Sequence, residues 1–215
     1  MDRPMWQWLS DNSDTLNVLA NAGMLIVWVT YLQVFLAGYR RERRAKILVN
    51  RGGGTDLRAR CLLSNMSAEP IYIQSIVARL QTADASALCQ LTDLENLDED
   101  AGPGDPMRTL KQGPLGAGCF IDIGTFDDVV RETIGRVASD DPQAWRRKLQ
   151  AIEITVVAVY GPDELLAGAE RRFECRADGE VIQLRPTSIG TRQIRSRRDR
   201  RSLENMLLGD LCRVE

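Results

Sequence analysis

Residues 16–39 form an apolar run with no charged side chain, LNVLANAGMLIVWVTYLQVFLAGY. As a helix these 24 residues would extend about 36 Å at about 1.5 Å per residue, which exceeds the hydrocarbon core of a bilayer, about 30 Å thick. A buried core helix would show a polar stripe, whereas Asn17, Asn21, Thr30 and Gln33 are scattered. A cleaved signal peptide has a shorter apolar region followed by a small-residue cleavage site. The pattern therefore predicts a retained transmembrane helix over 16–39.

Five cations follow the apolar run within seven positions: Arg40, Arg41, Arg43, Arg44 and Lys46. The fifteen residues before the run hold three aspartates and a single arginine. Cytoplasmic flanks of membrane helices collect Lys and Arg. The sequence thus predicts that the protein lies in the inner (plasma) membrane of a bacterial type of cell, with its N-terminus outside and its C-terminal domain in the cytoplasm. The five cations are expected to contact anionic lipid headgroups, each contributing about 1 kcal/mol near the surface.

Two polar amides, Asn21 and Gln33, lie inside the apolar run. Such amides hydrogen-bond across to neighbouring helices in membranes. At about 100° per residue the two lie on different faces, so one neighbouring helix cannot satisfy both. They are candidate helix–helix contacts, and they raise the alternative that the protein is an accessory subunit of a transporter or channel complex.

Beyond residue 56 the hydrophobic period changes from helical to alternating, which is typical of strands. Strand patterns cover 57–65, 70–81, 119–123, 151–160 and two short stretches on either side of Asp178-Gly179. Both faces of 151–160 are largely apolar, which predicts a central strand. The Asp-Gly pair predicts a hairpin turn.

Two short helical patterns interrupt the strands. The first spans 125–137 with Thr125 as N-cap and acids in the first turn, and the second follows Asp141, with Pro142 at its first position. No strand–helix–strand alternation recurs, so a doubly wound parallel sheet is not expected. About seven strands of this spacing predict a mainly β protein with an antiparallel β-sandwich of immunoglobulin-like kind and a short helical insertion.

The last segment, 189–215, combines cations with an apolar stripe. The cations are Arg195, Arg197, Arg198, Arg200 and Arg201, and the stripe includes Leu203, Leu207 and Leu211, with Ser202 as the expected N-cap of a C-terminal amphipathic helix. These eight residues are candidate contacts with lipid or a partner. Such a segment can lie on an anionic membrane, dock in a partner's groove, bind RNA phosphates or pack on the sandwich with its arginines in solvent.

The expected division of the chain follows from these patterns. It comprises an extracytoplasmic N-terminal segment (1–15), the transmembrane helix (16–39), a basic juxtamembrane segment and linker (40–56), the cytosolic β-sandwich domain (57–188), and a basic tail with the amphipathic helix (189–215).

Composition narrows the chemistry. The net charge of -2 argues against a general nucleic-acid binder, and 44% hydrophobic residues suit a globular protein. The absence of histidine removes the usual general acid/base and the commonest metal ligand. Five scattered cysteines without a CxxC spacing predict no zinc site and suit a reducing compartment.

Two acidic groups remain as candidate chemistry. The loop 92–106 is rich in Asp and Glu, but it lacks the ordered spacing of a calcium loop, so we expect a solvated loop. Asp122, Asp127 and Asp128 leave an unorthodox carboxylate-based enzyme as an alternative.

The sequence as a whole predicts a non-enzymatic, single-pass, membrane-anchored interaction or scaffolding protein. Its expected partners are membrane lipids and either another protein or a second copy of itself. No cofactor, metal, catalytic residue or small-molecule substrate is predicted.

Overall fold

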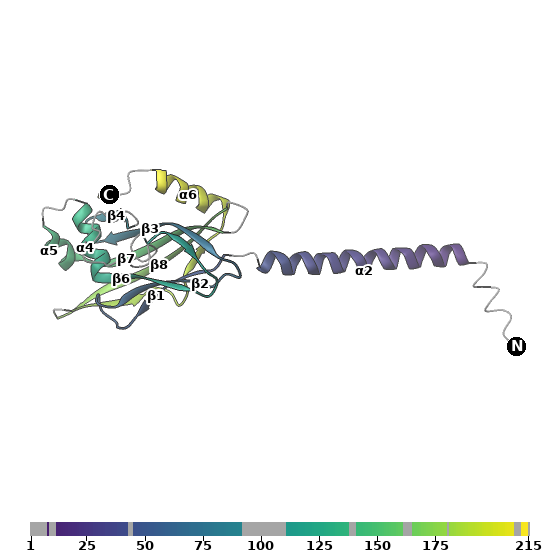
Figure 1. Ribbon diagram of the computed structural model, residues 1–215, viewed down its shortest axis with the longest axis horizontal. Helices are drawn as coiled ribbons and strands as arrows, with labels where there is room; N and C mark the ends of the chain where they lie inside the picture. The colour runs from purple at the N-terminus through teal and green to yellow at the C-terminus, as the bar shows by residue number, and fades with distance from the viewer. Residues whose placement is uncertain are drawn as a thin grey trace. The chain divides into compact units, whose positions relative to one another are not determined.

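The computed structural model describes residues 8, 12–42, 45–91, 111–137, 141–160, 165–179, 181–208 and 212–214. The chain divides into two compact units, Met1–Arg44 and Ala45–Glu215. The first contains the helix α2, Ser13–Glu42, and the second contains all the strands (Figure 1). The prediction of a mainly β protein with an N-terminal apolar helix and antiparallel sheets is confirmed.

Between residues 16 and 39, helix α2 carries no charge and shows apolar side chains around its whole circumference, with a few scattered polar residues among them. Its described side chains are exposed from Ser13 to Tyr39, and Trp28 packs edge-on against Tyr31, with 6.4 Å between ring centroids. The hydroxyl of Thr30 donates to the carbonyl of Ile26, so this polar group is satisfied within the helix. A helix that is hydrophobic on all sides needs an apolar environment.

The second unit is built from strands joined by short helices. Its strands are β1 (Ile47–Gly52), β2 (Arg60–Asn65), β3 (Ile71–Gln81), β4 (Ser86–Gln90), β5 (Gly113–Leu115), β6 (Phe120–Thr125), β7 (Ala151–Tyr160), β8 (Leu165–Asp178), β9 (Val181–Pro186), β10 (Arg192–Ile194) and β11 (Cys212–Val214). Its helices are α4 (Phe126–Arg136), α5 (Pro142–Lys148) and α6 (Arg197–Leu208).

The strands form two antiparallel sheets. The larger has the order β10-β8-β7-β3-β4-β11, with β5 also paired to β3 and β9 also paired to β8. The smaller has the order β1-β2-β6. At the centre of the larger sheet, β3 and β7 pair from Ile71↔Tyr160 to Gln81↔Ala151, and a bulge in β3 lies between Ile73 and Ser75. This division into eight and three strands differs from the four-plus-three division of an immunoglobulin constant domain.

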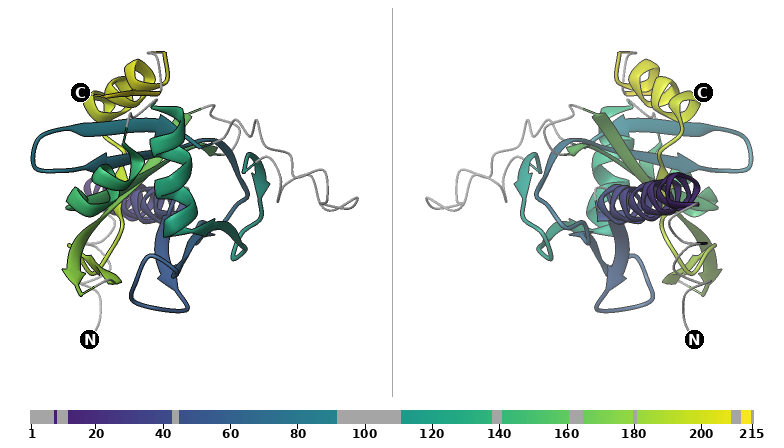
Figure 2. Two further views of the ribbon diagram at one scale, coloured as in Figure 1. Left: turned by 90° about the vertical axis from the view of Figure 1, so that its left-hand side faces the viewer. Right: turned by 90° about the vertical axis from the view of Figure 1, so that its right-hand side faces the viewer.

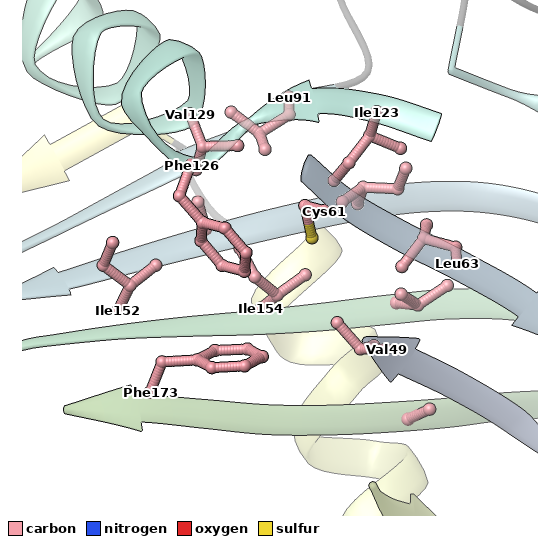
Figure 3. Packing of buried hydrophobic residues seen from close by; sticks show 14 of the residues in the cluster. Val49, Cys61, Leu63, Leu91, Ile123, Phe126, Val129, Ile152, Ile154 and Phe173 are labelled. Atoms are coloured by element: carbon pink, nitrogen blue, oxygen red, sulfur yellow. The ribbon is translucent and has the colours of Figure 1, made fainter. Parts of the chain in front are cut away.

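A single large core lies between the sheets and beneath α4. Figure 3 shows Val49 and Leu63 of the smaller sheet facing Ile154 and Phe173 of the larger one. Phe126, the first residue of α4, packs against Phe173 with 4.9 Å between ring centroids and 66° between the ring planes. Figure 2 shows α4 and α5 together at one end of this unit.

Local signals in the sequence place the helix starts and one hairpin correctly. Thr125 caps α4, and a reciprocal bond joins the carboxylate of Asp128 to the Thr125 backbone. Asp141 caps α5 by accepting from the amide of Ala144. The turn between β8 and β9 falls at Asp178-Gly179, where Gly179 has φ +63°. These predictions are confirmed because each depends on interactions within a few residues of sequence.

The prediction of a linker over 40–56 is wrong in its middle part. Residues 47–52 form β1, whose Ile47 and Val49 are fully buried, and β1 pairs with β2 from Ile47↔Asn65 to Gly52↔Arg60. Flanking cations and the glycines at 52–54 masked a strand of only six residues.

The predicted start of the C-terminal helix is also wrong. Helix α6 begins at Arg197, six residues before Leu203, and Ser196 accepts from the amide of Asp199 in place of the expected cap at Ser202. The chain then returns to the larger sheet as β11, which pairs Cys212↔Cys89 on β4. The end of the segment predicted to be the amphipathic helix, 212–214, is therefore a strand.

Candidate membrane-facing surface

The chain enters the domain at Ala45 and Lys46, and both residues are fixed by hydrogen bonds. The carbonyl of Ala45 accepts from Arg195 Nη2 at 2.7 Å. The amide of Lys46 donates to Ser67 Oγ at 2.8 Å, and its carbonyl accepts from the Met66 amide at 2.8 Å. Segments around 66 and 195, far apart in sequence, therefore meet at the entry point.

Side chains cover the outer edge of β1 where a further strand could pair. Thr191 Oγ1 accepts from the Val49 amide at 3.0 Å, and the Gln193 side chain both accepts from the Ile47 amide at 3.1 Å and donates to its carbonyl at 2.6 Å. Together with Arg195 these residues alternate along the chain, so their side chains form a ladder against β1. The ladder satisfies backbone groups that would otherwise be buried without partners, and it joins the two sheets along one side.

Arg171 on β8 extends this ladder from inside the domain. Its Nη1 donates to the Val49 carbonyl at 2.7 Å and to Asn50 Oδ1, and its Nη2 donates to the carbonyls of Ser188 and Ile189 at 3.2 and 3.1 Å. The guanidinium lies 5.5 Å from the centre of the Phe173 ring.

The guanidinium of Arg171 is surrounded by neutral acceptors, mainly backbone carbonyls, and by the Phe173 ring. Burial lowers the pKa of Arg171, and the nearby charge of Arg51 lowers it further. An arginine nevertheless stays charged in proteins, so neutral oxygen acceptors and the face of Phe173 must balance this cation. Its role is to tie β1 to β8 and to the loop before β10.

Asn65 organises the loops next to the entry point. This fully buried side chain donates from Nδ2 to the carbonyls of Glu69, Leu115 and Gly116 at 3.0, 2.9 and 3.2 Å. Its backbone amide donates to the carbonyl of Cys119 at 2.9 Å. The loop after β2 and the loop between β5 and β6 are thereby held side by side.

Two large apolar side chains are exposed beside these loops, Met66 directly after β2 and Phe120 at the start of β6. Phe120 is 65% exposed and Met66 52% exposed. Phe120 pairs with Ser64, whose side chain lies on the outer face of the smaller sheet, and Met66 follows two residues later. Neither residue could be singled out from the sequence, because their exposure depends on strand register.

The structure describes the side chains of five of the cations that the sequence singled out as membrane or partner contacts. Lys46, Arg195, Arg198 and Arg201 are exposed, and Arg200 is partly exposed. Arg40 and Arg41 belong to α2, and Arg197 is the first residue of α6; their side chains are not among those described. Arg43, Arg44 and Leu211 lie outside the described residues. Since α6 begins two residues after Arg195, its arginines start next to the entry point.

The apolar stripe of α6 faces the larger sheet. Leu203 is 2% exposed and packs with Val157 and Ile194, and Leu207 is partly buried against the same cluster. The expectation that Leu203 contacts lipid or a partner is therefore wrong, because β7 and β10 already cover it. The arginines of α6 remain available.

Gly168 on β8 permits this close packing. A Cβ at this position would lie 2.6 Å from Leu203 Cδ1 and 3.0 Å from Ile194 Cβ. Leu203 can rotate, but Ile194 is fixed by its pairing with Gly168 itself. No side chain can be added here without moving α6 or β10.

We expect Gly168→Ala to destabilise the domain by about 1–3 kcal/mol, the usual result of overpacking a filled core. The measurement is equilibrium unfolding of the full chain in detergent, together with hydrogen exchange of the α6 amides. Gly135→Ala is the matched control, since nothing lies within 4 Å of its Cβ position on α4. Equal stability of both variants would contradict this account of the α6 contact.

The candidate catalytic carboxylates have structural partners. Asp122 pairs with Arg60, and Asp127 pairs with Arg146 at 2.5 Å. Partial burial raises the pKa of Asp128, but hydrogen bonds from Thr125 and the charge of Arg131 outweigh it, so the net pKa lies below the ordinary value. Asp128 thus remains an ionised helix cap.

A shallow groove of about 230 Å³ lies between α4 and α5. It is lined by Val130, Arg131, Ile134, Gly135, Pro142, Gln143 and Arg146. None of the three candidate carboxylates lines it. Within the described ranges, no cluster of three or more Asp, Glu or Cys side chains could hold a metal ion.

An ion-paired cluster fixes the two chain ends that flank residues 92–110. Glu132 on α4 pairs with Lys111 at 3.0 Å and with Arg136 at 3.2 Å. Arg136 also donates to the carbonyl of Gln90 at 3.0 Å. The acidic loop predicted over 92–106 lies outside the described residues.

The described cysteines are free, and they differ in accessibility. Cys61 and Cys89 are buried, Cys175 is partly buried and Cys119 is exposed. Burial raises the pKa of the Cys61 thiol, and the nearby Asp122 charge raises it further. Burial raises the pKa of Cys175 to about 12. Cys119 is thus the reactive thiol among these four.

One helix of the described chain is long and apolar enough to cross a membrane. It covers Ser13–Tyr39, with a mean hydropathy of 1.7 in its most apolar window and no buried residue there. This statement rests on length and composition. Asn21 and Gln33 are both exposed on that helix. No protein-family model, no curated protein and no solved structure matches the chain.

Proposed function

We propose that the protein is a non-enzymatic, single-pass protein of the inner membrane that presents a cytosolic β-sandwich as an interaction or scaffolding module. The observation that carries the proposal is the charge-free part of α2, residues 16–39, which is exposed on all sides and is followed directly by five cations within seven positions. Exposing such an apolar surface to water is unfavourable, whereas the hydrocarbon core of a bilayer accommodates it.

The orientation follows from the charge distribution and is supported by the cysteines. The cations stand on the C-terminal side of the helix, where the positive-inside tendency predicts cytosol. Cys61, Cys89, Cys119 and Cys175 are free thiols, as expected in a reducing compartment.

A sandwich architecture for the domain is part of the proposal. Its support is the shared core, in which Val49 and Leu63 from one sheet meet Ile154 and Phe173 from the other. The immunoglobulin-like connectivity stays a prediction.

An interaction role is supported by what the polar side chains do. Asp122, Asp127 and Asp128 serve ion pairs and a helix cap, and the entry residues Ala45 and Lys46 are bonded to two separate segments. The first residues of the domain are therefore fixed to the rest of it. A domain that positions a partner needs such a fixed attachment point.

The test is whether the full-length protein is found in a complex after extraction in mild detergent. Cross-linking in intact cells, followed by mass measurement of the purified particle, should show a second copy or another protein bound to it. A particle containing a single copy of this chain alone would contradict the scaffolding role.

A second candidate function is an accessory subunit of a membrane transporter or channel complex, and the exposed amides of Asn21 and Gln33 favour it. Replacing both with leucine should then reduce recovery of the complex, because interhelical hydrogen bonds would be lost. Thr30→Val is the control, since the Thr30 hydroxyl is already bonded within α2. Unchanged recovery in the double variant would remove this candidate.

A further inference from the structure

We propose that the domain itself docks on an anionic lipid bilayer through the end at which the chain enters it. Phe120 and Met66 would enter the headgroup region, while Lys46, Arg195, Arg198 and Arg201 contact lipid phosphates and anionic headgroups. We name these six residues the entry surface. This inference rests on the membrane span proposed above.

The apolar part of the entry surface has no partner within the described domain. Phe120 and Met66 are both more than half exposed; Met66 lies on the loop after β2 and Phe120 begins β6, directly after the loop that the buried Asn65 holds in place. A large exposed aromatic at the start of a paired strand is suited to the membrane interface, where an apolar ring can enter without disordering the backbone.

The basic part lies on the other side of the same two residues. Arg195 bonds the carbonyl of Ala45, while Met66 bonds the carbonyl of Lys46. The cations and the apolar pair therefore flank two adjacent residues, Ala45 and Lys46, which directly precede β1. Cationic and apolar groups in this combination bind anionic interfaces more strongly than either does alone.

The position of the arginines in α6 also calls for an anionic partner. Four of its first five residues are arginines, and Asp199 is the single acid among them. Cations at a helix N-terminus oppose the positive end of the helix dipole, so this arrangement disfavours the isolated helix. Among the described residues, no carboxylate forms an ion pair with Arg195, Arg198, Arg200 or Arg201.

The short connection between α2 and the domain favours a lipid surface over a soluble partner. Only Arg43 and Arg44 stand between Glu42, the last residue of α2, and Ala45. Three Cα–Cα steps of connecting chain span at most about 11 Å. If α2 is inserted, the bilayer is always present beside this end of the domain, and any other partner must compete with it.

The test uses the full-length protein carrying Cys212→Ser, labelled at Cys119 with a polarity-sensitive fluorophore and reconstituted in nanodiscs. One set of discs contains phosphatidylcholine alone and the other contains phosphatidylglycerol as well. Cys119 is exposed and adjacent to Phe120, so its label reports contact with lipid.

We expect the emission to shift to shorter wavelength in the anionic discs, and the shift to be lost in high salt and in Phe120→Ser. Ile189→Ser is the matched control, because Ile189 is fully exposed on the loop before β10, beside Val49 and away from Ala45. That variant should keep the whole shift.

Three results would overturn the inference. No shift in either disc would mean that the domain stands away from lipid. Equal shifts in both discs would remove the anionic preference. A shift in native membrane vesicles that is absent from pure lipid discs would assign the entry surface to a protein partner. Retention in the membrane after carbonate washing, measured on the same sample, separates failure of docking from failure of the span.

Discussion

Replacing Arg171 with methionine is expected to lower the free energy of unfolding of the domain by about 3–5 kcal/mol, because several oxygen acceptors lose a donor at about 1–3 kcal/mol for each one left buried and unsatisfied. Four acceptors lose the donor that Arg171 supplies: the carbonyls of Val49, Ser188 and Ile189 and the side chain of Asn50, of which the Val49 carbonyl keeps a bond from Thr191 Oγ1 at 3.4 Å. Methionine fills much of the volume but cannot donate to any of them. The measurement is urea unfolding of the full-length protein in detergent, monitored through the circular dichroism signal of its β-sheets.

One further variant separates the several donors of the guanidinium from its charge, and a second serves as a control. Arg171→Lys keeps the charge but cannot reach acceptors on both β1 and the 188–189 loop, so we expect most of the loss to remain. Arg185→Ala removes an exposed arginine from the neighbouring strand β9 and should change stability by less than about 0.5 kcal/mol. If Arg171→Met were no more destabilising than Arg185→Ala, the role assigned to Arg171 would be wrong.

Replacing the five cations that follow the apolar run 16–39 with serine is expected to abolish the preferred orientation. The change affects Arg40, Arg41, Arg43, Arg44 and Lys46. Without them neither flank holds an excess of Lys and Arg, so the free-energy difference between the two orientations falls. The share of molecules whose Cys119 reacts with an impermeant thiol reagent in intact cells should rise from nearly none to a substantial fraction.

The control for that experiment removes the same number of cations elsewhere. Suitable exposed residues are Arg58, Arg131, Arg147, Arg176 and Arg185. Their replacement by serine changes the net charge equally but leaves the flanks of α2 intact, so orientation should not change. If both sets of substitutions had the same effect, the cations next to α2 would not determine topology.

Short-range features of this fold could be predicted from the sequence. Thr125 and Asp141 cap their helices because the capping bonds span three residues. The turn at Asp178-Gly179 needs a positive φ, which the sequence provides with glycine. The apolar pattern of β7 predicts its central position, since both its faces are covered.

Long-range features could not be predicted in this way. Arg171 is one arginine among 25, and nothing local distinguishes a buried guanidinium from a solvated one. Asn65 likewise acts through bonds to residues 50 and 51 positions away. In the tail, Leu203 and Leu207 lie on α6, but only the packing on Val157 and Ile194 shows what that side of the helix covers.

The placement of the domain is tested most directly at Cys119 in the unmodified protein. Intact cells are treated with an impermeant thiol reagent, and a second sample is treated after permeabilisation. We predict no labelling of Cys119 in intact cells and complete labelling once the membrane is opened, because this exposed thiol would lie in the cytosol. Equal labelling of Cys119 in both samples would contradict the account, since the domain would then lie outside the cell.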